Sequence, residues 1–430
     1  MILKKLADEK TMTSFATTTS QYLTPEYLRE LPVQYGTPLW VYDSAVIVER
    51  IKQLQLFDTV RFAQKACSNI HILRLMREQG VKVDSVSLGE IERALVAGFQ
   101  AGRDNAEIVF TADVLDKATL IKVTELDIPV NAGSIDMLEQ IGEQKAGHPV
   151  WLRINPGFGH GHSQKTNTGG ENSKHGIWYQ DLPKALEKIR QYNLSLVGLH
   201  MHIGSGVDYQ HLANVCDSMA ELVISAGVDI QAISAGGGLS TPYREEDELI
   251  DVQNYYSLWN SARQRIEQHL GHSIELEIEP GRYLVAESGV LLAEVRAVKD
   301  MGSRHYVLVD SGFNDLMRPA MYGSYHHISV LPENGNTVDS RQQKETIIAG
   351  PLCESGDVFT QLEGGMVETR LLPDVNIGDY LVFHDTGAYG ASMSSNYNSR
   401  PLLPEVMFVN GQAKLIRRRQ TIEELLALEL

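Results

Sequence analysis

Short β-type runs alternate with helical stretches between residues 60 and 278, and this alternation is the feature that most limits the fold. We expect strands at Val60–Ala63, Val81–Asp84, Ile108–Thr111, Pro129–Asn131, Val150–Ile154, Leu196–Met201, Ile230–Ser234 and Ile274–Ile278. We expect helices between them at Ile70–Glu78, Leu88–Ala97, Leu115–Glu125, Ile135–Glu143, Leu182–Tyr192, Leu212–Ala226 and Tyr255–Leu270. Eight strands with helices between them over about 230 residues match a (β/α)8 barrel of the TIM type.

A second, β-rich domain is expected because 430 residues exceed what one hydrophobic core usually holds. After Glu287 the strand-like runs are separated by Gly, Pro and Asn, with a closing helical segment at 422–430. These runs are Gly289–Lys299, His305–Val309, Glu345–Ile348, Met366–Leu371 and Asp379–His384. We predict an α/β chain with three parts: a tail and strand at 1–45 that joins the β domain, the barrel at 46–288, and a β-barrel-like domain at 289–430.

Composition excludes several classes of partner. The net charge of −17 argues against nucleic acid or an anionic membrane surface. The sequence has no apolar run near the length of a membrane span, and its first residues lack the apolar core of a signal peptide, so we expect a cytoplasmic protein. Cys67, Cys216 and Cys353 are too few and too scattered for a disulfide framework or a thiolate zinc site.

Polar side chains follow the predicted strands at the ends that carry the chemistry in this fold. Lys65 comes directly after the first strand, and Asp84 closes the second. A lysine at a strand end is usually a solvated surface residue, but a partly buried one can lose its proton and attack a carbonyl. The residues at the other strand ends therefore indicate whether Lys65 is a surface residue or a reactive one.

The last three predicted strands end in residues that suit a phosphorylated ring. Three consecutive glycines, 236–238, follow the seventh strand, where backbone N–H groups can approach an anion closely. Glu279 follows the eighth strand and needs a cationic partner, such as a pyridinium nitrogen or an arginine. His202 follows the sixth and can stack on a ring or pack in the core. With Lys65, this set meets the needs of pyridoxal 5′-phosphate (PLP).

A long loop, Pro156–Gly176, leaves the fifth strand on the same rim. Its histidines, His160, His162 and His175, suggest a metal, but no carboxylate or cysteine stands at ligand spacing, so we expect no metal site. Long loops at this rim are more often binding loops or lids.

The sequence resembles the barrel-fold PLP-dependent decarboxylases from about Tyr35 to the C-terminus. The motifs that carry the resemblance are Phe62-Ala-Gln-Lys65-Ala, His202-Ile-Gly-Ser205, Gly236-Gly-Gly238, Glu279-Pro-Gly-Arg282, Arg318-Pro-Ala-Met-Tyr322, Cys353-Glu354-Ser-Gly-Asp357 and Gly387-Ala-Tyr389. Within the family, the pattern is similar to members that convert meso-2,6-diaminopimelate to L-lysine and CO2. This is the final step of lysine biosynthesis.

The resemblance implies a role for each motif. It implies that Lys65 attaches the cofactor, His202 stacks on its ring and Glu279 pairs with the ring nitrogen. The residues implied around the phosphate are Ser205, Gly238, Gly281, Arg282 and Tyr389. The residues implied to support the lysine and ring are Asp84, Glu90 and Arg153. The residues implied to meet the substrate are Arg282, Arg318, Tyr322 and Tyr389, with Glu354 at its distal ammonium.

The resemblance also implies that Cys353 is the proton donor. In relatives Cys353 and Glu354 come from the partner subunit, so a homodimer with shared active sites is implied.

A carboxylate beside the ring nitrogen keeps that nitrogen protonated, which favours decarboxylation. Alanine racemase, which shares the barrel, has an arginine there. A related decarboxylase of D-lysine, D-ornithine, arginine or carboxynorspermidine remains an alternative, as does a non-catalytic PLP-binding or antizyme-like protein. Lys65 and Cys353 argue against the latter, since such proteins tend to lose the reactive groups.

Overall fold

The computed structural model describes residues 20–430 except 159–168, 203–207, 336 and 339. Ser205, His160 and His162 therefore lie outside the described residues. None of the helices in the described part of the chain is long and apolar enough to cross a membrane.

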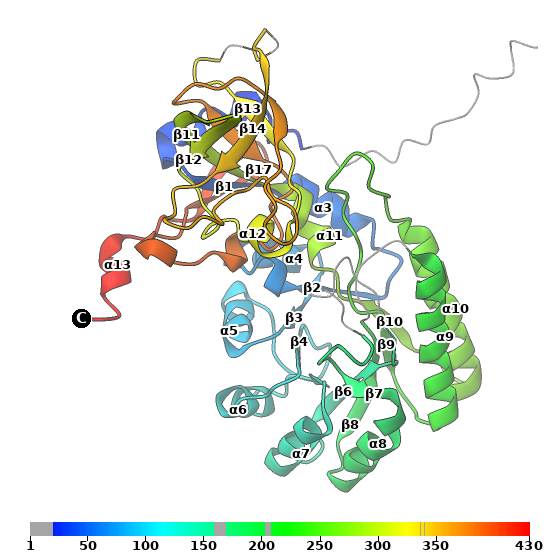
Figure 1. The fold of residues 1–430 in the computed structure, drawn as a ribbon. Coiled ribbons are helices and arrows are strands. Elements are labelled where there is room, and N and C mark those ends of the chain that lie inside the picture. Colours follow the sequence, from blue (N-terminus) through cyan, green and yellow to red (C-terminus); the bar gives the residue numbers. More distant parts are fainter. Residues whose placement is uncertain (1–19, 159–168, 203–207, 336, 339) are drawn as a thin grey trace, which may run out of the picture.

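A closed parallel barrel forms the larger part of the molecule (Figure 1). Each strand pairs in parallel with the next, and the last pairs with the first, so the sheet has no free edge. Its strands are β2 (Thr59–Ala63), β3 (Lys82–Ser85), β4 (Ile108–Ala112), β5 (Val130–Ala132), β6 (Pro149–Asn155), β8 (Ser195–His200), β9 (Ala232–Ser234) and β10 (Glu275–Ile278). The predicted (β/α)8 fold and its eight strands are confirmed, and a short strand, β7 (Ile177–Trp178), pairs in parallel with the C-terminal end of β6.

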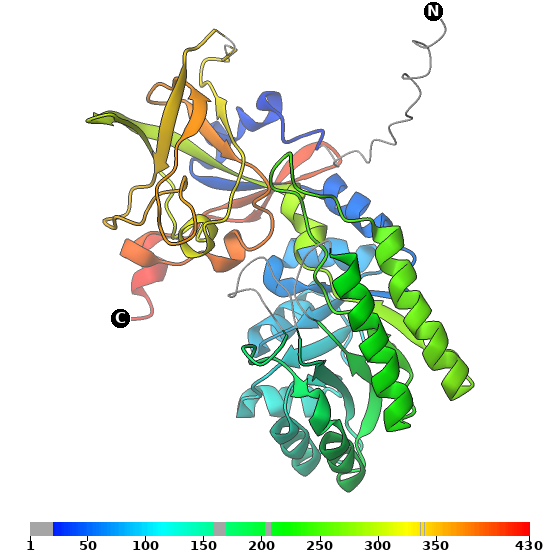
Figure 2. The same cartoon turned by 45° about the vertical axis from the view of Figure 1, so that its right-hand side comes forward.

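Helices surround the barrel (Figures 1 and 2). They are α3 (Ser44–Lys52), α4 (Ile70–Glu78), α5 (Leu88–Ala97), α6 (Lys117–Glu125), α7 (Ile135–Gln144), α8 (Leu182–Gln191), α9 (Tyr209–Ala226) and α10 (Val252–Leu270), with 3-10 turns at 64–66 and 179–181. Side chains that accept a hydrogen bond from the first turn fix where several begin, as Ser87 does for α5 and Ser134 for α7. The helices thus start where the sequence predicts, within a few residues.

The second domain is built on a mixed nine-stranded sheet. Its strands are β1 (Leu39–Asp43), β11 (Gly289–Met301), β12 (Arg304–Val309), β13 (Ile328–Leu331), β14 (Gln343–Ala349), β15 (Arg370–Pro373), β16 (Tyr380–Phe383), β17 (Glu405–Val409) and β18 (Gln412–Arg417). β1 lies between β11 and β17, so the first strand of the chain pairs with two of the later ones.

Three strands of this sheet, β13, β17 and β18, have no counterpart among the predicted runs. The run predicted at 366–371 is also displaced, since β15 begins only at Arg370. The short helices are α1 (Pro25–Leu28), α2 (Leu31–Tyr35), α11 (Arg282–Val285), α12 (Arg318–Tyr322) and α13 (Ile422–Leu426), with 3-10 turns at 286–288, 391–393 and 397–399.

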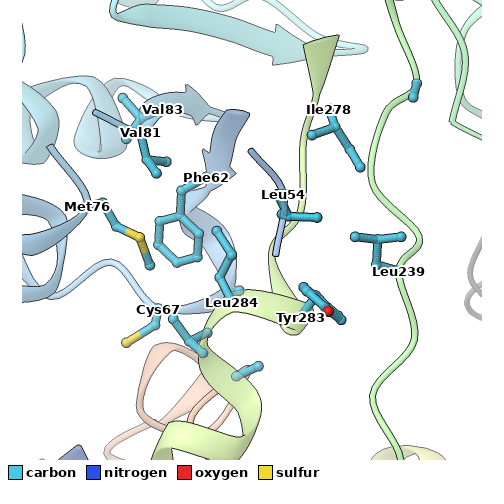
Figure 3. Close-up of a cluster of buried hydrophobic side chains, with 14 of the residues drawn as sticks. Leu54, Phe62, Cys67, Met76, Val81, Val83, Leu239, Ile278, Tyr283 and Leu284 are labelled. Carbon is cyan, nitrogen blue, oxygen red and sulfur yellow. The ribbon is translucent and has the colours of Figure 1, made fainter. Parts of the chain in front are cut away.

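A packed core lies beneath the start of the first βα connection (Figure 3). The ring of Phe62 on β2 is fully buried among Met76, Val83 and Leu284, and Cys67 is 2 % exposed at the edge of the same cluster. Burial raises the pKa of the Cys67 thiol to about 12, so this thiol stays neutral and fills space. The segment that carries Lys65 therefore packs on a fully buried hydrophobic cluster.

Candidate active site

One cavity of about 620 Å³ opens at the carboxyl ends of the barrel strands, where the second domain faces them. It is lined from the barrel by Lys65, Asp84, Arg153, His202, Gly238, Glu279, Gly281 and Arg282, and from the second domain by Arg318, Tyr322 and Tyr389. Eleven of the residues predicted for the site thus line a single cavity. This is the face on which (β/α)8 enzymes hold their active sites.

Lys65 follows β2, and its side chain is exposed to the cavity. The backbone around it is tied to the second domain, because the carbonyl of Ala66 accepts hydrogen bonds from the Tyr389 amide at 2.8 Å and the Ser392 hydroxyl at 3.1 Å. Asn69 caps α4 and also donates to Glu405 on β17 at 3.0 Å. Both domains therefore fix the position of Lys65.

Glu279 is a buried carboxylate whose two oxygens are both held. His200 Nε2 lies 2.8 Å from Oε2, and the Ser234 hydroxyl donates to Oε1 at 2.8 Å. Burial alone would raise the pKa of Glu279, but the charge and hydrogen bond of His200, with the bond from Ser234, lower it to about 2. Each carboxylate oxygen can accept more than one hydrogen bond, so Glu279 can still accept one from a group in the cavity.

Asp84, Glu90 and Arg153 lie around this centre. Burial and the charge of Glu279 raise the pKa of Asp84, and its Oδ1 atom is buried without a hydrogen bond among the described residues. Glu90 accepts a hydrogen bond from the Val86 amide at 2.8 Å and does not line the cavity. Arg153 is buried, and burial lowers its pKa despite the neighbouring carboxylates.

His202 presents a neutral imidazole to the cavity. Its Nδ1 atom accepts a hydrogen bond from the Gly237 amide at 2.9 Å, so this nitrogen carries no proton. Burial, and then the charge of Arg153, lower the pKa of His202 well below its ordinary value. A neutral ring held at one edge suits stacking on a flat ligand.

The glycines on the rim leave room that a side chain would fill. Gly236 has φ +61°, and a Cβ there would lie 2.6 Å from the Cβ of His202. Gly238 also has positive φ, at +100°. A Cβ on Gly281 would lie 3.2 Å from the Cβ of Ala66. The bare backbone of this rim can therefore approach an anion closely.

Two arginines converge in the wall of the cavity. Arg282 Nη1 donates to the Tyr243 hydroxyl at 2.7 Å, and Arg318 Nη1 donates to the same oxygen at 3.0 Å. The Arg282 guanidinium also lies 4.9 Å from the ring centre of Tyr389. The sequence predicts both arginines and Tyr389 but not Tyr243.

Cys353 and Glu354 do not line the cavity of their own chain. They follow β14 in an exposed segment, where the Cys353 amide donates to Asn398 at 2.9 Å and the Tyr397 hydroxyl lies 3.4 Å from Glu354. One chain thus brings eleven of the predicted residues to the cavity, while Cys353, Glu354 and Glu90 lie outside its lining and Ser205 lies outside the described residues.

Sequence reasoning missed three residues of the site: His200, Ser234 and Tyr243. His200 and His202 alternate along the strand end, so a shared direction could have been read from the sequence. Ser234 ends β9 next to the glycines, so its place at the same rim could also have been inferred from the sequence. Tyr243 lies in an irregular segment after the glycines and gives no such signal.

Asp113 anchors the part of the histidine-rich loop that the structure describes. His175 Nδ1 contacts Asp113, and the Gly176 amide donates to the same carboxylate at 3.1 Å. Within the described residues, no three His, Cys, Asp or Glu side chains gather as a metal site would require.

The fold and the site together define a class, the PLP-dependent decarboxylases with a barrel fold. The model of the pyridoxal binding domain of pyridoxal-dependent decarboxylases matches residues 45–286. The buried, anionic Glu279, the glycine rim and the lysine facing one cavity suit the nitrogen, phosphate and aldehyde of that cofactor.

Individual relatives narrow the class. The chain is 71 % identical over 408 residues to diaminopimelate decarboxylase of Escherichia coli K12, covering 95 % of this chain and 97 % of that one. A crystal structure of a diaminopimelate decarboxylase matches with a TM-score of 0.94 at 70 % identity, over 96 % of this chain and 98 % of the other. The Helicobacter pylori enzyme complexed with L-lysine matches with a TM-score of 0.84 at 29 % identity, over 94 % and 99 %. The chain belongs to the diaminopimelate decarboxylase family.

Proposed function

We infer that the protein is a PLP-dependent carboxy-lyase that converts meso-2,6-diaminopimelate to L-lysine and CO2, the last step of lysine biosynthesis. The observation that carries this inference is the buried Glu279 carboxylate, held by His200 and Ser234 with a pKa of about 2. When bound, PLP supplies an electron sink for the charge left on the α-carbon by departing CO2. A carboxylate that stays ionised at the ring nitrogen keeps a proton there and strengthens that sink.

The chain's own residues would hold the cofactor at each of its ends. Lys65 would bind it covalently through Nζ, and Asp84, Glu90 and Arg153 would fix the charges around this lysine. The neutral ring of His202 would pack against the cofactor ring. The phosphate would lie among Ser205, Gly238, Gly281, Arg282 and Tyr389.

Residues of both domains would select the substrate. The far end of meso-2,6-diaminopimelate carries a carboxylate and an ammonium, so it needs a cation and an anion in fixed places. Arg282, Arg318, Tyr322 and Tyr389 line the cavity where that end would lie. The complex of the Helicobacter pylori relative with L-lysine supports a site for this product.

We propose that Cys353 and Glu354 act in the active site of the partner subunit of a homodimer. Both are exposed and lie outside the cavity lining of their own chain, which supports this role. There Glu354 would bind the distal ammonium, and the Cys353 thiol would return a proton to the α-carbon. The cytoplasmic location and the lack of a nucleic-acid partner remain predictions from the sequence.

Mixing inactive variants tests the shared site. In a mixed dimer of Lys65→Ala and Cys353→Ala subunits, both lesions fall in the same shared site, so the other site is intact and activity returns. If each site used Cys353 of its own chain, every subunit would carry one lesion and mixing would restore nothing.

Release of CO2 from alternative substrates tests the function itself. We expect meso-2,6-diaminopimelate to be decarboxylated with the highest kcat/KM, because only it presents both charges at the far end. The comparison uses D-lysine, D-ornithine, arginine and carboxynorspermidine under the same conditions. A clear preference for any of these would overturn the proposal, and no turnover of any substrate with PLP bound would support a non-catalytic protein.

A further inference from the structure

Tyr243 brings two guanidinium groups of like charge to one oxygen atom. Its hydroxyl accepts from Arg282 at 2.7 Å and from Arg318 at 3.0 Å, and both guanidinium carbons lie near its ring, 5.7 Å and 5.0 Å from the centre. Arg282 comes from the barrel and Arg318 from the second domain. The phenol therefore bridges the two domains in the wall of the cavity.

The surroundings hold all three groups in this arrangement. The backbone amides of Tyr243 and Arg244 both donate to the Asp247 carboxylate, at 2.8 Å and 2.9 Å, which fixes the segment carrying the phenol. On the other side, Arg318 is 7 % exposed and also donates to the Ser324 hydroxyl at 3.2 Å.

His326 completes the support of Arg318. Its Nδ1 atom lies 2.9 Å from the carbonyl of His384, which requires a proton on Nδ1 and leaves Nε2 free to accept from Arg318 at 3.4 Å. The His326 ring also packs edge-on against Tyr243, with ring centres 5.4 Å apart.

The hydrogen-bond capacity of a phenol then decides where its proton goes. A tyrosine hydroxyl accepts at most two hydrogen bonds and donates one. Since Arg282 and Arg318 fill both acceptor positions, the remaining interaction of the oxygen is donation. An anion that enters the cavity between the two arginines is the acceptor that the charges favour.

We propose that Tyr243 sets the specificity for the distal carboxylate of the substrate, by holding Arg282 and Arg318 side by side and by donating its own hydroxyl hydrogen to that carboxylate. This inference rests on the proposed function, because it concerns an amino acid with a second carboxylate. A substrate without that group would leave two cations and one hydroxyl unpaired in the cavity.

The variant Tyr243→Phe tests this role, because it keeps the ring and its contacts with both guanidinium groups and removes only the hydroxyl. In the holoenzyme we expect KM for meso-2,6-diaminopimelate to rise at least tenfold, with kcat within threefold of the wild type. The affinity for L-lysine, measured by calorimetry, should fall by a similar factor, because L-lysine keeps the distal carboxylate. The affinity of the apoprotein for PLP should change less than threefold.

The matched control is Tyr283→Phe. It also removes a hydroxyl that is hydrogen-bonded to an arginine, but its partner is Arg50 on α3, at 3.3 Å, rather than a residue of the cavity. An unchanged KM in Tyr243→Phe overturns the proposal, as does an equal rise in Tyr283→Phe, which would indicate a general loosening of α11. A loss of PLP affinity in Tyr243→Phe assigns the hydroxyl to the cofactor and also overturns it. If the wild type fails to decarboxylate meso-2,6-diaminopimelate, the proposed function itself is wrong.

Discussion

Replacing Glu279 with glutamine removes one negative charge and keeps the shape of the side chain. The pKa of Glu279 is about 2, against an ordinary value of 4.5. The difference of about 2.5 pH units, at about 1.4 kcal/mol each, means that the site favours the anion by about 3 kcal/mol. A hydrogen bond from a protonated ring nitrogen to this anion is charge-assisted and contributes about 1.5–3 kcal/mol, which Glu279→Gln would remove. We therefore expect kcat to fall about 100-fold, since about 1.4 kcal/mol corresponds to a factor of ten.

The assay is CO2 release from meso-2,6-diaminopimelate, with bound PLP quantified by its absorbance. Glu277→Gln is the matched control, because Glu277 lies two residues earlier and is equally buried, but pairs with Arg61 at 2.6 Å and 3.0 Å instead of facing the cavity. Breaking that buried pair should lower the free energy of unfolding by about 3–5 kcal/mol and leave kcat of the folded enzyme near the wild type. A Glu279→Gln enzyme that binds PLP and keeps kcat within threefold would refute the reasoning.

Three further perturbations give separate outcomes. Gly236 has φ +61°, and Gly236→Ala places a Cβ 2.6 Å from the Cβ of His202. The affinity for PLP, measured by titration of the apoprotein, should therefore fall at least tenfold. An unchanged affinity would contradict a role of the glycine rim in binding the cofactor. Asp385 lies in the left-handed region at φ +56°, and burial raises its pKa to about 7. The folded-state pKa of Asp385 exceeds its unfolded value, so ionisation of this side chain destabilises the fold as pH rises through 7. Asp385→Asn should therefore raise Tm at pH 8 but hardly at pH 4. An equal rise of Tm at both pH values would indicate an effect of backbone preference alone. Cys353→Ala should lower kcat about 100-fold or more while substrate still binds, and near-normal turnover would assign the proton to another acid.

The barrel could be predicted from the sequence because each of its strands is a short β-type run with a helix on either side. β2, for example, needs no distant contact to be recognised, since Val60, Phe62 and Ala63 are apolar and Lys65 follows the run. The second domain could be predicted less well. β17 and β18 become strands because β17 pairs with β1, almost the whole chain away, and no local pattern marks that pairing.

The same distinction applies to the site. Lys65, Glu279 and the glycines were predictable because strand ends of a parallel barrel meet on one rim. Tyr243 was not, because its role depends on two arginines that the fold brings to it from different domains. Cys353 and Glu354 were assigned by resemblance, and one chain alone does not bring them to the cavity.

The attachment point of the cofactor tests the central claim most directly. Borohydride reduction of the holoenzyme, followed by digestion and mass spectrometry, fixes PLP to the amine that holds it. We predict that the pyridoxyl group is found on Lys65, the lysine that lines the cavity with Glu279 and the glycine rim. Its recovery on any other lysine would contradict the placement of the active site.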